Sequence, residues 1–215
     1  MTIDLDWLDF RPLSRLDAKE HMDACREGKN YLGNFLGWGN HAPNWDFKEH
    51  VVWLEDFIKS PEPLKSYVLY LQKRMVGFAS FGQGLDDYGL QICYWVRKKY
   101  SGQGLGTVLT EMMIHNAFFV HRMHYVDLHI DQNNLGSLGI PKKLNFKLVD
   151  EYVEESPEGV QQSGKMQIWS LENPHGMFRR PKKVIPSRRR FGWSQSSLYH
   201  SRLLNRNDQP VQLPI

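Results

Sequence analysis

A glycine-rich stretch lies between a strongly apolar segment and an amphipathic one. In the segment 101–107 the glycines Gly102, Gly104 and Gly106 alternate with other residues. Glycine lets the backbone come close to a ligand and adopt turns that a Cβ would forbid. The free N–H groups at the start of a following helix point toward any anion placed there. The order strand, Gly-x-Gly-x-Gly, helix therefore predicts a cradle for a pyrophosphate group, and a glycine-rich turn that binds nothing is the alternative.

A second informative pattern, an alternation of polar and apolar residues, lies in the segment 125–131. Alternate residues of a strand point to the same side, so Tyr125, Asp127, His129 and Asp131 share one face against three aliphatic residues on the other. This stripe predicts side chains that line a cleft and move protons. The alternative is that they only make hydrogen bonds with neighbouring helices.

The elements that must position these residues follow from hydrophobic periodicity. The pattern predicts strands over about 7–13, 66–72, 75–82, 88–97, 125–131, 146–153 and 165–171, and helices over about 17–26, 46–59, 104–120 and 133–144. Gly136, Gly139 and Pro141 weaken the last helix, which is expected to be short and irregular. Residues 28–45 show no clear period and are expected to form a loop. Lys73-Arg74 is expected to close a tight hairpin.

Composition and charge narrow the class of protein. The 215 residues are 41% hydrophobic, which is enough for a sizeable core. The sequence contains no run of 18 apolar residues, so no transmembrane helix is expected. The N-terminus lacks the pattern of a signal peptide, and two cysteines cannot form a disulfide framework. A cytoplasmic location and no membrane partner are therefore expected.

The net charge of +3 is unevenly distributed. From Pro174 onward nine Lys or Arg residues stand against Asp208 alone, which leaves the first 173 residues with a net charge of −5. We therefore expect one domain over 1–173 and a basic extension over 174–215. The basic charge of 179–206 suits RNA, a ribosome or an acidic partner, and the aromatic residues in the extension suit stacking on single-stranded RNA. A solvated tail is the alternative.

No metal site is expected. Cys25 and Cys93 fall on different predicted elements and are interpreted as plain buried thiols. The histidines have no metal-ligand spacing on one predicted face; this holds for His41, His50, His115, His121 and His124.

The order β-α-α-β-β-β-α-β-α-β-β, with a glycine-rich turn after the fourth strand, resembles the GNAT acetyltransferase superfamily. The family's phosphate loop is usually Arg/Gln-x-x-Gly-x-Gly/Ala, and Ser101 stands where Arg or Gln is usual. Residues 134–137 (Asn-Leu-Gly-Ser), with Phe146 nine residues after the serine, resemble its Asn-x-x-Ser … Lys-Leu-Gly-Phe signature, although Asn145 replaces a glycine. Residues 31–38 are similar to the Leu-Pro-Trp segment of the RimJ/RimL branch. The resemblance covers about residues 7–172.

This resemblance implies an α/β (α+β) GNAT fold, in which about four helices flank a mixed central sheet of about seven strands. It implies acetyl-CoA as co-substrate and no metal. The strand end near 94–96 would pair with the pantetheine arm, and Asn134 would bind that arm. The expected cofactor-binding residues are Tyr94, Trp95, Val96, Ser101, Gly102, Gln103, Gly104, Leu105, Gly106, Thr107 and Asn134.

Acyl transfer from a thioester to an amine needs a neutral amine and a stabilised leaving thiolate. Many relatives carry Glu where this chain has Gln91, so the base would come from elsewhere; Asp127 and His129 are the candidates. A tyrosine often protonates the thiolate in this superfamily, but Pro141 holds its position. The RimJ/RimL branch uses the serine of Asn-x-x-Ser, which is Ser137 here, and a role in ordering the helix is the alternative.

The RimJ/RimL resemblance implies acetylation of a protein N-terminal α-amine or of a small amine. A GNAT fold that binds acyl-CoA without transfer stays open because of Ser101, Gln91 and Pro141. An RNA- or ribosome-binding protein that uses the tail is a third possibility. Whether the chain acts alone or as a homodimer also stays open.

Overall fold

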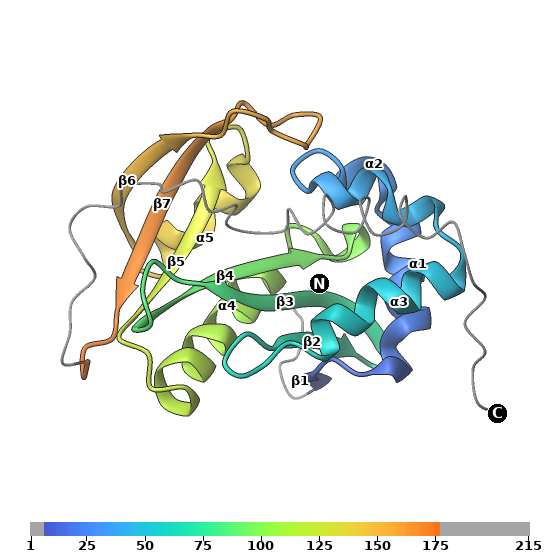
Figure 1. The fold of residues 1–215 in the computed structure, drawn as a ribbon, viewed down its shortest axis with the longest axis horizontal. Helices are drawn as coiled ribbons and strands as arrows, with labels where there is room; N and C mark the ends of the chain where they lie inside the picture. Colours follow the sequence, from blue (N-terminus) through green and yellow to red (C-terminus); the bar gives the residue numbers. More distant parts are fainter. Residues whose placement is uncertain (1–6, 177–215) are drawn as a thin grey trace, which may run out of the picture.

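The computed structural model describes residues 7–176, which form one seven-stranded sheet with helices on both faces (Figure 1). The strands are β1 (Leu8–Pro12), β2 (Ser66–Leu71), β3 (Arg74–Gln83), β4 (Gly89–Val96), β5 (Tyr125–Asp131), β6 (Lys147–Val153) and β7 (Lys165–Glu172). The α-helices are α1 (Ala18–Glu27), α2 (Lys29–Leu32), α3 (Phe47–Ile58), α4 (Leu105–His115) and α5 (Leu135–Lys143). The predicted order of strands and long helices is confirmed.

The sheet has the strand order β1-β2-β3-β4-β5-β7-β6, and β4–β5 is its one parallel pair in the described chain. That ladder joins 89–91 to 125–127 and ends at Gln91 and Asp127. Beyond it, β4 continues along β3 and β5 continues along β7. The two strands therefore diverge into a wedge, and Figure 1 shows their separation.

Alternation along the central strands builds two apolar layers. On one face Leu69 and Ala79 pack with side chains of α4, and on the other face Val68 and Phe78 pack with α1 and α3. Successive residues of a strand point to opposite sides, so β3 supplies both cores from a nearly continuous apolar run. The rigid centre of the sheet fixes the base of the wedge.

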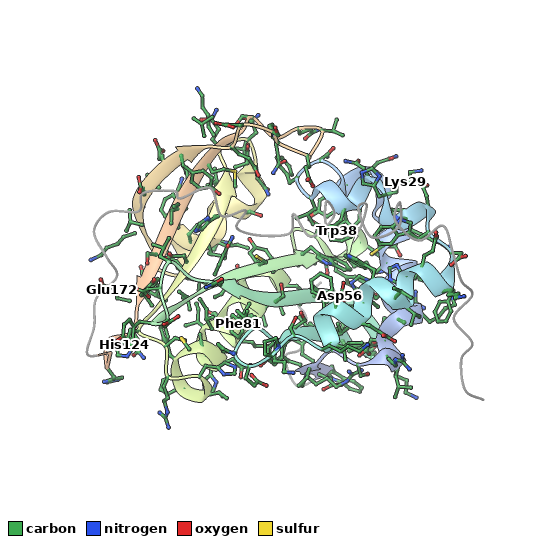
Figure 2. The ribbon with its side chains drawn as sticks, in the orientation of Figure 1. Lys29, Trp38, Asp56, Phe81, His124 and Glu172 are labelled. Carbon is green, nitrogen blue, oxygen red and sulfur yellow. The ribbon has the colours of Figure 1, made fainter. Side chains whose placement is uncertain are left out.

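The segment 28–45 differs from the expected loop. It contains α2 and two 3₁₀ turns at Gly37–Asn40 and Ala42–Asn44. Trp38, labelled in Figure 2, is buried here with its ring centroid 5.3 Å from that of Trp53. Short helices of this kind have no amphipathic period, because the burial of one large aromatic ring holds them in place and no row of apolar residues is needed. Hydrophobic periodicity therefore does not predict them.

Helix α5 also differs from the prediction, because it is a regular nine-residue α-helix. The Asn134 side chain caps it by accepting the backbone N–H of Ser137 at 3.2 Å. Ile140 and Pro141 are buried, and Ile140 packs so closely on Gly106 that a Cβ there would lie 2.9 Å from its Cδ1. Tertiary packing thus overrides the weak helix propensity of this segment.

Two smaller expectations are corrected as well. The predicted helix 104–120 ends its α-helical part at His115 and continues as a π-helix over Asn116–Val120. The β2–β3 hairpin turns at Gln72 and Lys73, which have left-handed φ values of 47° and 68°. The predicted turn pair was Lys73-Arg74, one residue further along the chain.

A buried histidine pair links α1 to α3. His21 Nδ1 and His50 Nε2 lie 3.0 Å apart, and the Cys25 thiol lies 3.4 Å from His21 Nδ1. Aromatic rings surround the pair, including Trp53 and Trp95. Burial lowers the pKa of His50 to about 4 and lowers that of His21 well below its usual value. Both rings are therefore neutral at physiological pH.

We expect the folded state to lose stability as the pH falls from about 6.5 to about 4. The unfolded chain takes up protons on histidine near pH 6.5, whereas the fold keeps His50 neutral to about pH 4. A pKa depressed by folding stabilises the protein above the unfolded pKa, and this stability is lost as the pH falls through the folded pKa. His50 should account for about 3 kcal/mol. Urea unfolding across this pH range measures the loss.

The variant His50→Gln lacks the titrating ring, so its free energy of unfolding should fall less over the same window. His115→Gln is the matched control, because His115 is exposed on α4. Identical pH dependence in His50→Gln and the parent protein would contradict the prediction.

Candidate active site

A cavity of about 650 Å³ occupies the wedge between β4 and β5. Its lining comes from four regions: the facing strand edges, the glycine-rich loop, α5, and the two connections 31–37 and 152–162. The backbone edges of 92–96 and 128–131 face this space without a neighbouring strand in the described chain. Unpaired strand edges need hydrogen-bond partners, so the wedge suits an extended polar chain laid along β4.

The glycine-rich loop lies at the mouth of the wedge. Gly102 and Gly104 have φ values of 76° and 86°, and nothing lies within 4 Å of where their Cβ atoms would be. Thr107 donates its N–H to the Gly104 carbonyl at 3.0 Å, so it belongs to the helix. Within the described residues, the backbone N–H groups of 103–106 have no such partner. The predicted cradle is therefore open over 103–106, and Thr107 also lines the cavity, so binding by the predicted loop residues stays a proposal.

Gly106 has a different role from the other two glycines. It lines the cavity, but its missing side chain makes room for Ile140 of α5. At the other end of the loop, Ser101 shares a 3.3 Å hydrogen bond with Tyr31, and Gln103 donates to the Lys99 carbonyl at 3.1 Å. The first contact ties the loop to α2, and the second is a bond within the loop.

The strand end predicted to hold the pantetheine arm, 94–96, does line the cavity. Asn134 lines it too, but its side-chain oxygen is already engaged as the helix cap. Its amide nitrogen makes no hydrogen bond with the described residues, and binding by Asn134 stays a proposal.

Ser137 and Tyr94 meet inside the wedge. Burial raises the pKa of Tyr94 to about 12, and the nearby Ser137 side chain partly offsets the rise. The Tyr94 hydroxyl nevertheless has no well-aligned partner among the described residues, so the two hydroxyls are close without a settled hydrogen bond. The cap is Asn134 and not Ser137, which leaves the Ser137 hydroxyl available for chemistry.

The polar stripe of β5 is divided among several roles. His129 lines the cavity and its Nδ1 lies 3.3 Å from the Tyr152 hydroxyl. Asp127 is buried beside the end of the β4–β5 ladder and is not among the lining residues. The Tyr125 hydroxyl donates to Asp86 at 2.9 Å. The structure thus brings His129 and Ser137 to one cavity and leaves Asp127 outside its wall.

The connections 31–37 and 154–164 close the far side of the cavity. The Val160 N–H donates to the Gly33 carbonyl at 3.0 Å, and the Gln161 N–H donates to that of Asn34 at 2.9 Å. Glu154 and Tyr152 line this side and escaped the sequence analysis. Only the long-range pairing of these loops places them at the cavity, and no local pattern signals it.

The described chain contains one compact group of potential metal ligands, the buried set His21, Cys25 and His50. It lies in the core between α1 and α3, and these residues do not line the cavity. The absence of a metal stays a prediction. No described helix is long and apolar enough to cross a membrane. The basic segment 179–206 lies outside the described residues.

Comparisons with known proteins agree with this geometry. A family model described as an acetyltransferase (GNAT) domain matches residues 8–147. RimL, a ribosomal alpha-N-protein acetyltransferase solved with coenzyme A, is 17% identical with a TM-score of 0.68, covering 77% of this chain and 93% of its own. Microcin C7 self-immunity acetyltransferase MccE, solved with acetyl-CoA and AMP, is 15% identical with a TM-score of 0.69, covering 78% and 93%.

A ribosomal-protein-S5-alanine acetyltransferase from Vibrio fischeri is 14% identical, with a TM-score of 0.65 over 84% of this chain and 100% of its own. At these identities the likeness shows the fold. No curated protein sequence matches the chain. The family match confirms the predicted GNAT superfamily, and these neighbours are consistent with its RimJ/RimL-like branch.

We expect Gly104→Val to weaken acetyl-CoA binding by at least about tenfold, or about 1.4 kcal/mol. The side chain would enter the open side of the cradle, and β-branched residues do not tolerate the φ of 86° found there. Titration calorimetry measures the affinity.

Gly104→Asn separates the two causes, because asparagine tolerates left-handed backbone but still adds a side chain. Both variants should bind weakly if the cradle holds the pyrophosphate. A folded Gly104→Val protein with unchanged affinity would show that the cradle is elsewhere.

Proposed function

The chain belongs to the GNAT acetyltransferase family, and we propose that it transfers the acetyl group of acetyl-CoA to a primary amine by direct attack on the thioester. A protein N-terminal α-amine is the favoured acceptor, and a small-molecule amine is the alternative. The observation that carries the proposal is the wedge beyond Gln91, with an open glycine cradle at its mouth. Neighbours solved with coenzyme A or acetyl-CoA support this donor.

In this proposal the N–H groups of 103–106 bind the donor pyrophosphate, and the free edge of β4 aligns the pantetheine arm. Gln91 cannot take a proton, but its buried amide oxygen has no partner among the described residues and can accept a hydrogen bond from the amine. Gln91 then orients the nucleophile at the base of the wedge. An α-amine has a pKa of about 7.7–8.0, so orientation and a modest base suffice.

His129 is the proposed base, because it lines the cavity and carries a ring nitrogen near Tyr152. The amine nitrogen bonds to the carbonyl carbon, the carbon–sulfur bond breaks, and His129 takes the amine proton directly or through water. The leaving sulfur receives a hydrogen bond or a proton from the Ser137 and Tyr94 hydroxyl pair. Asp127 lies buried beside the ladder and does not line the cavity, so it is not proposed as the group that touches the substrate.

The remaining proposals concern location and partners. Both cysteines are buried free thiols, which supports the proposed cytoplasmic location. Asn173 donates to the Met123 and His124 carbonyls, which supports a domain that extends at least to residue 173, and the boundary at 173 stays a proposal. Tail binding to RNA, a ribosome or an acidic partner, and a homodimer, stay proposals.

A thiol-release assay with acetyl-CoA tests the activity against a panel of N-terminal peptides and small primary amines. We expect release that depends on both the protein and an amine. Tight acetyl-CoA binding without release for any amine would favour the non-catalytic alternative that Gln91 keeps open.

We expect Ser137→Ala to lower kcat by at least about tenfold and to leave the KM for acetyl-CoA within about twofold, because the hydroxyl acts on sulfur mainly in the transition state. Tyr94→Phe should act in the same direction, and the double variant should lose less than the product of the single effects.

Ser60→Ala is the control, since Ser60 only donates to the Asp56 carbonyl at the end of α3. Wild-type kcat and KM in Ser137→Ala would make Ser137 structural.

A further inference from the structure

Acidic side chains gather on the side of the cavity that the end of β5 and the β6–β7 connection form. Asp131, Glu154 and Glu158 all line it, and Lys143 is the single Lys or Arg among the lining residues that the structure describes. The three acids come from the end of β5 and from the β6–β7 connection. In Figure 1 this connection (orange, top) reaches toward α2 (blue).

Glu154 shows that these charges crowd one another. Its pKa is raised, first by burial and then by the charges of Glu158 and Asp131. No hydrogen bond or ion pair holds its side chain within the described residues. A half-buried carboxylate beside two others is poorly stabilised by the protein alone, so a bound cation would relieve the repulsion.

The backbone holds these carboxylates in place. Asp131 accepts from the Ser163 and Gly164 N–H groups at 2.9 and 3.0 Å, which anchors the β6–β7 connection to β5. The Glu154 N–H donates to the Gly164 carbonyl at 2.7 Å. Glu158 packs over Gly37, where a Cβ would meet its side chain. Asp131 and the backbone of Glu154 are therefore fixed parts of the cavity wall, and the exposed Glu158 side chain packs beside them over Gly37.

An independent observation points to an amine in the same cavity. Gln91 is 6% exposed, lines the cavity and leaves its Oε1 without a partner in the described chain. Buried polar atoms nearly always have a hydrogen-bond partner, so a ligand that donates a hydrogen bond would satisfy this oxygen. An amine N–H fits it, and the acidic residues line the same cavity.

We propose that the acceptor carries a second positively charged group beside the amine that reacts, and that Glu154 and Glu158 bind this group. The inference rests on the proposed acetyl transfer and adds the class of acceptor. A linear diamine and a peptide with a basic residue next to its N-terminus share this chemistry.

Binding without turnover tests the proposal separately from the activity. Calorimetry in saturating coenzyme A compares 1,4-diaminobutane with butylamine, and an Ala-Lys peptide with its Ala-norleucine counterpart. In at least one pair the doubly charged member should bind about tenfold tighter at low salt, and the gain should shrink as salt screens the charges. The pair with the larger gain identifies the source of the second charge.

Glu154→Gln should remove most of this preference and leave binding of the singly charged member and of coenzyme A within about twofold. Glu155→Gln is the matched control, because Glu155 is the next residue, is exposed and does not line the cavity. It should keep the full preference. If Glu154 were instead the general base, Glu154→Gln would lower kcat for singly charged acceptors while leaving both affinities unchanged.

Equal affinity within both pairs, or a preference that survives Glu154→Gln, would overturn the inference. Absence of acetyl transfer with all four acceptors, alongside a clear charge preference in binding, would instead count against the proposed reaction.

Discussion

Two parallel strands that pair for three residues and then separate impose a constraint on everything around them. Beyond Gln91 and Asp127, β4 and β5 each keep one partner strand and present a bare edge to the other. Bare edges inside a protein are costly unless something pairs with them, and a parallel ladder left to itself would continue. The separation therefore persists because β3 and β7 pair with the outer edges of the two strands, and the space between them suits an extended ligand chain.

Three anchors keep that space open. At the end of β4 the buried Arg97 side chain binds Glu27 at 2.7 Å and Glu20 at 3.2 Å, which ties the strand to α1 just before the glycine-rich loop. At the end of β5 the Asp131 carboxylate accepts hydrogen bonds from the N–H groups of Ser163 and Gly164, which directly precede β7. Across the top, the connections after α2 and β6 join through backbone hydrogen bonds. Two anchors each hold one wall and the third joins the two sides, so the walls are fixed by contacts within the protein.

The sequence predicts the parts of this design that repeat or alternate. Strand alternation and helical periods are properties of neighbouring residues, so the element order and the glycine cradle are readable. In the sequence Gly106 is indistinguishable from Gly102 and Gly104. A glycine is needed at 106 for a different reason, which is the close packing of Ile140, 34 residues away. Long-range contacts likewise decide the regularity of α5 around Pro141 and the place of Glu154 in the acceptor wall. They also bring together His21, Cys25 and His50, which no spacing on a single predicted face connects.

An acidic acceptor wall creates a tension with the chemistry. Carboxylates attract an ammonium group, but they also stabilise its charged form, whereas attack on a thioester requires the neutral amine. Gln91, in place of a carboxylate, adds no negative charge of its own beside the reacting nitrogen, and Asp127, its partner in the ladder, does not line the cavity. A second positive charge on the acceptor eases the tension further, because like charges in one molecule lower the pKa of the amine. Glu154 can then hold the acceptor by its outer charge, while the inner amine is the one that gives up its proton.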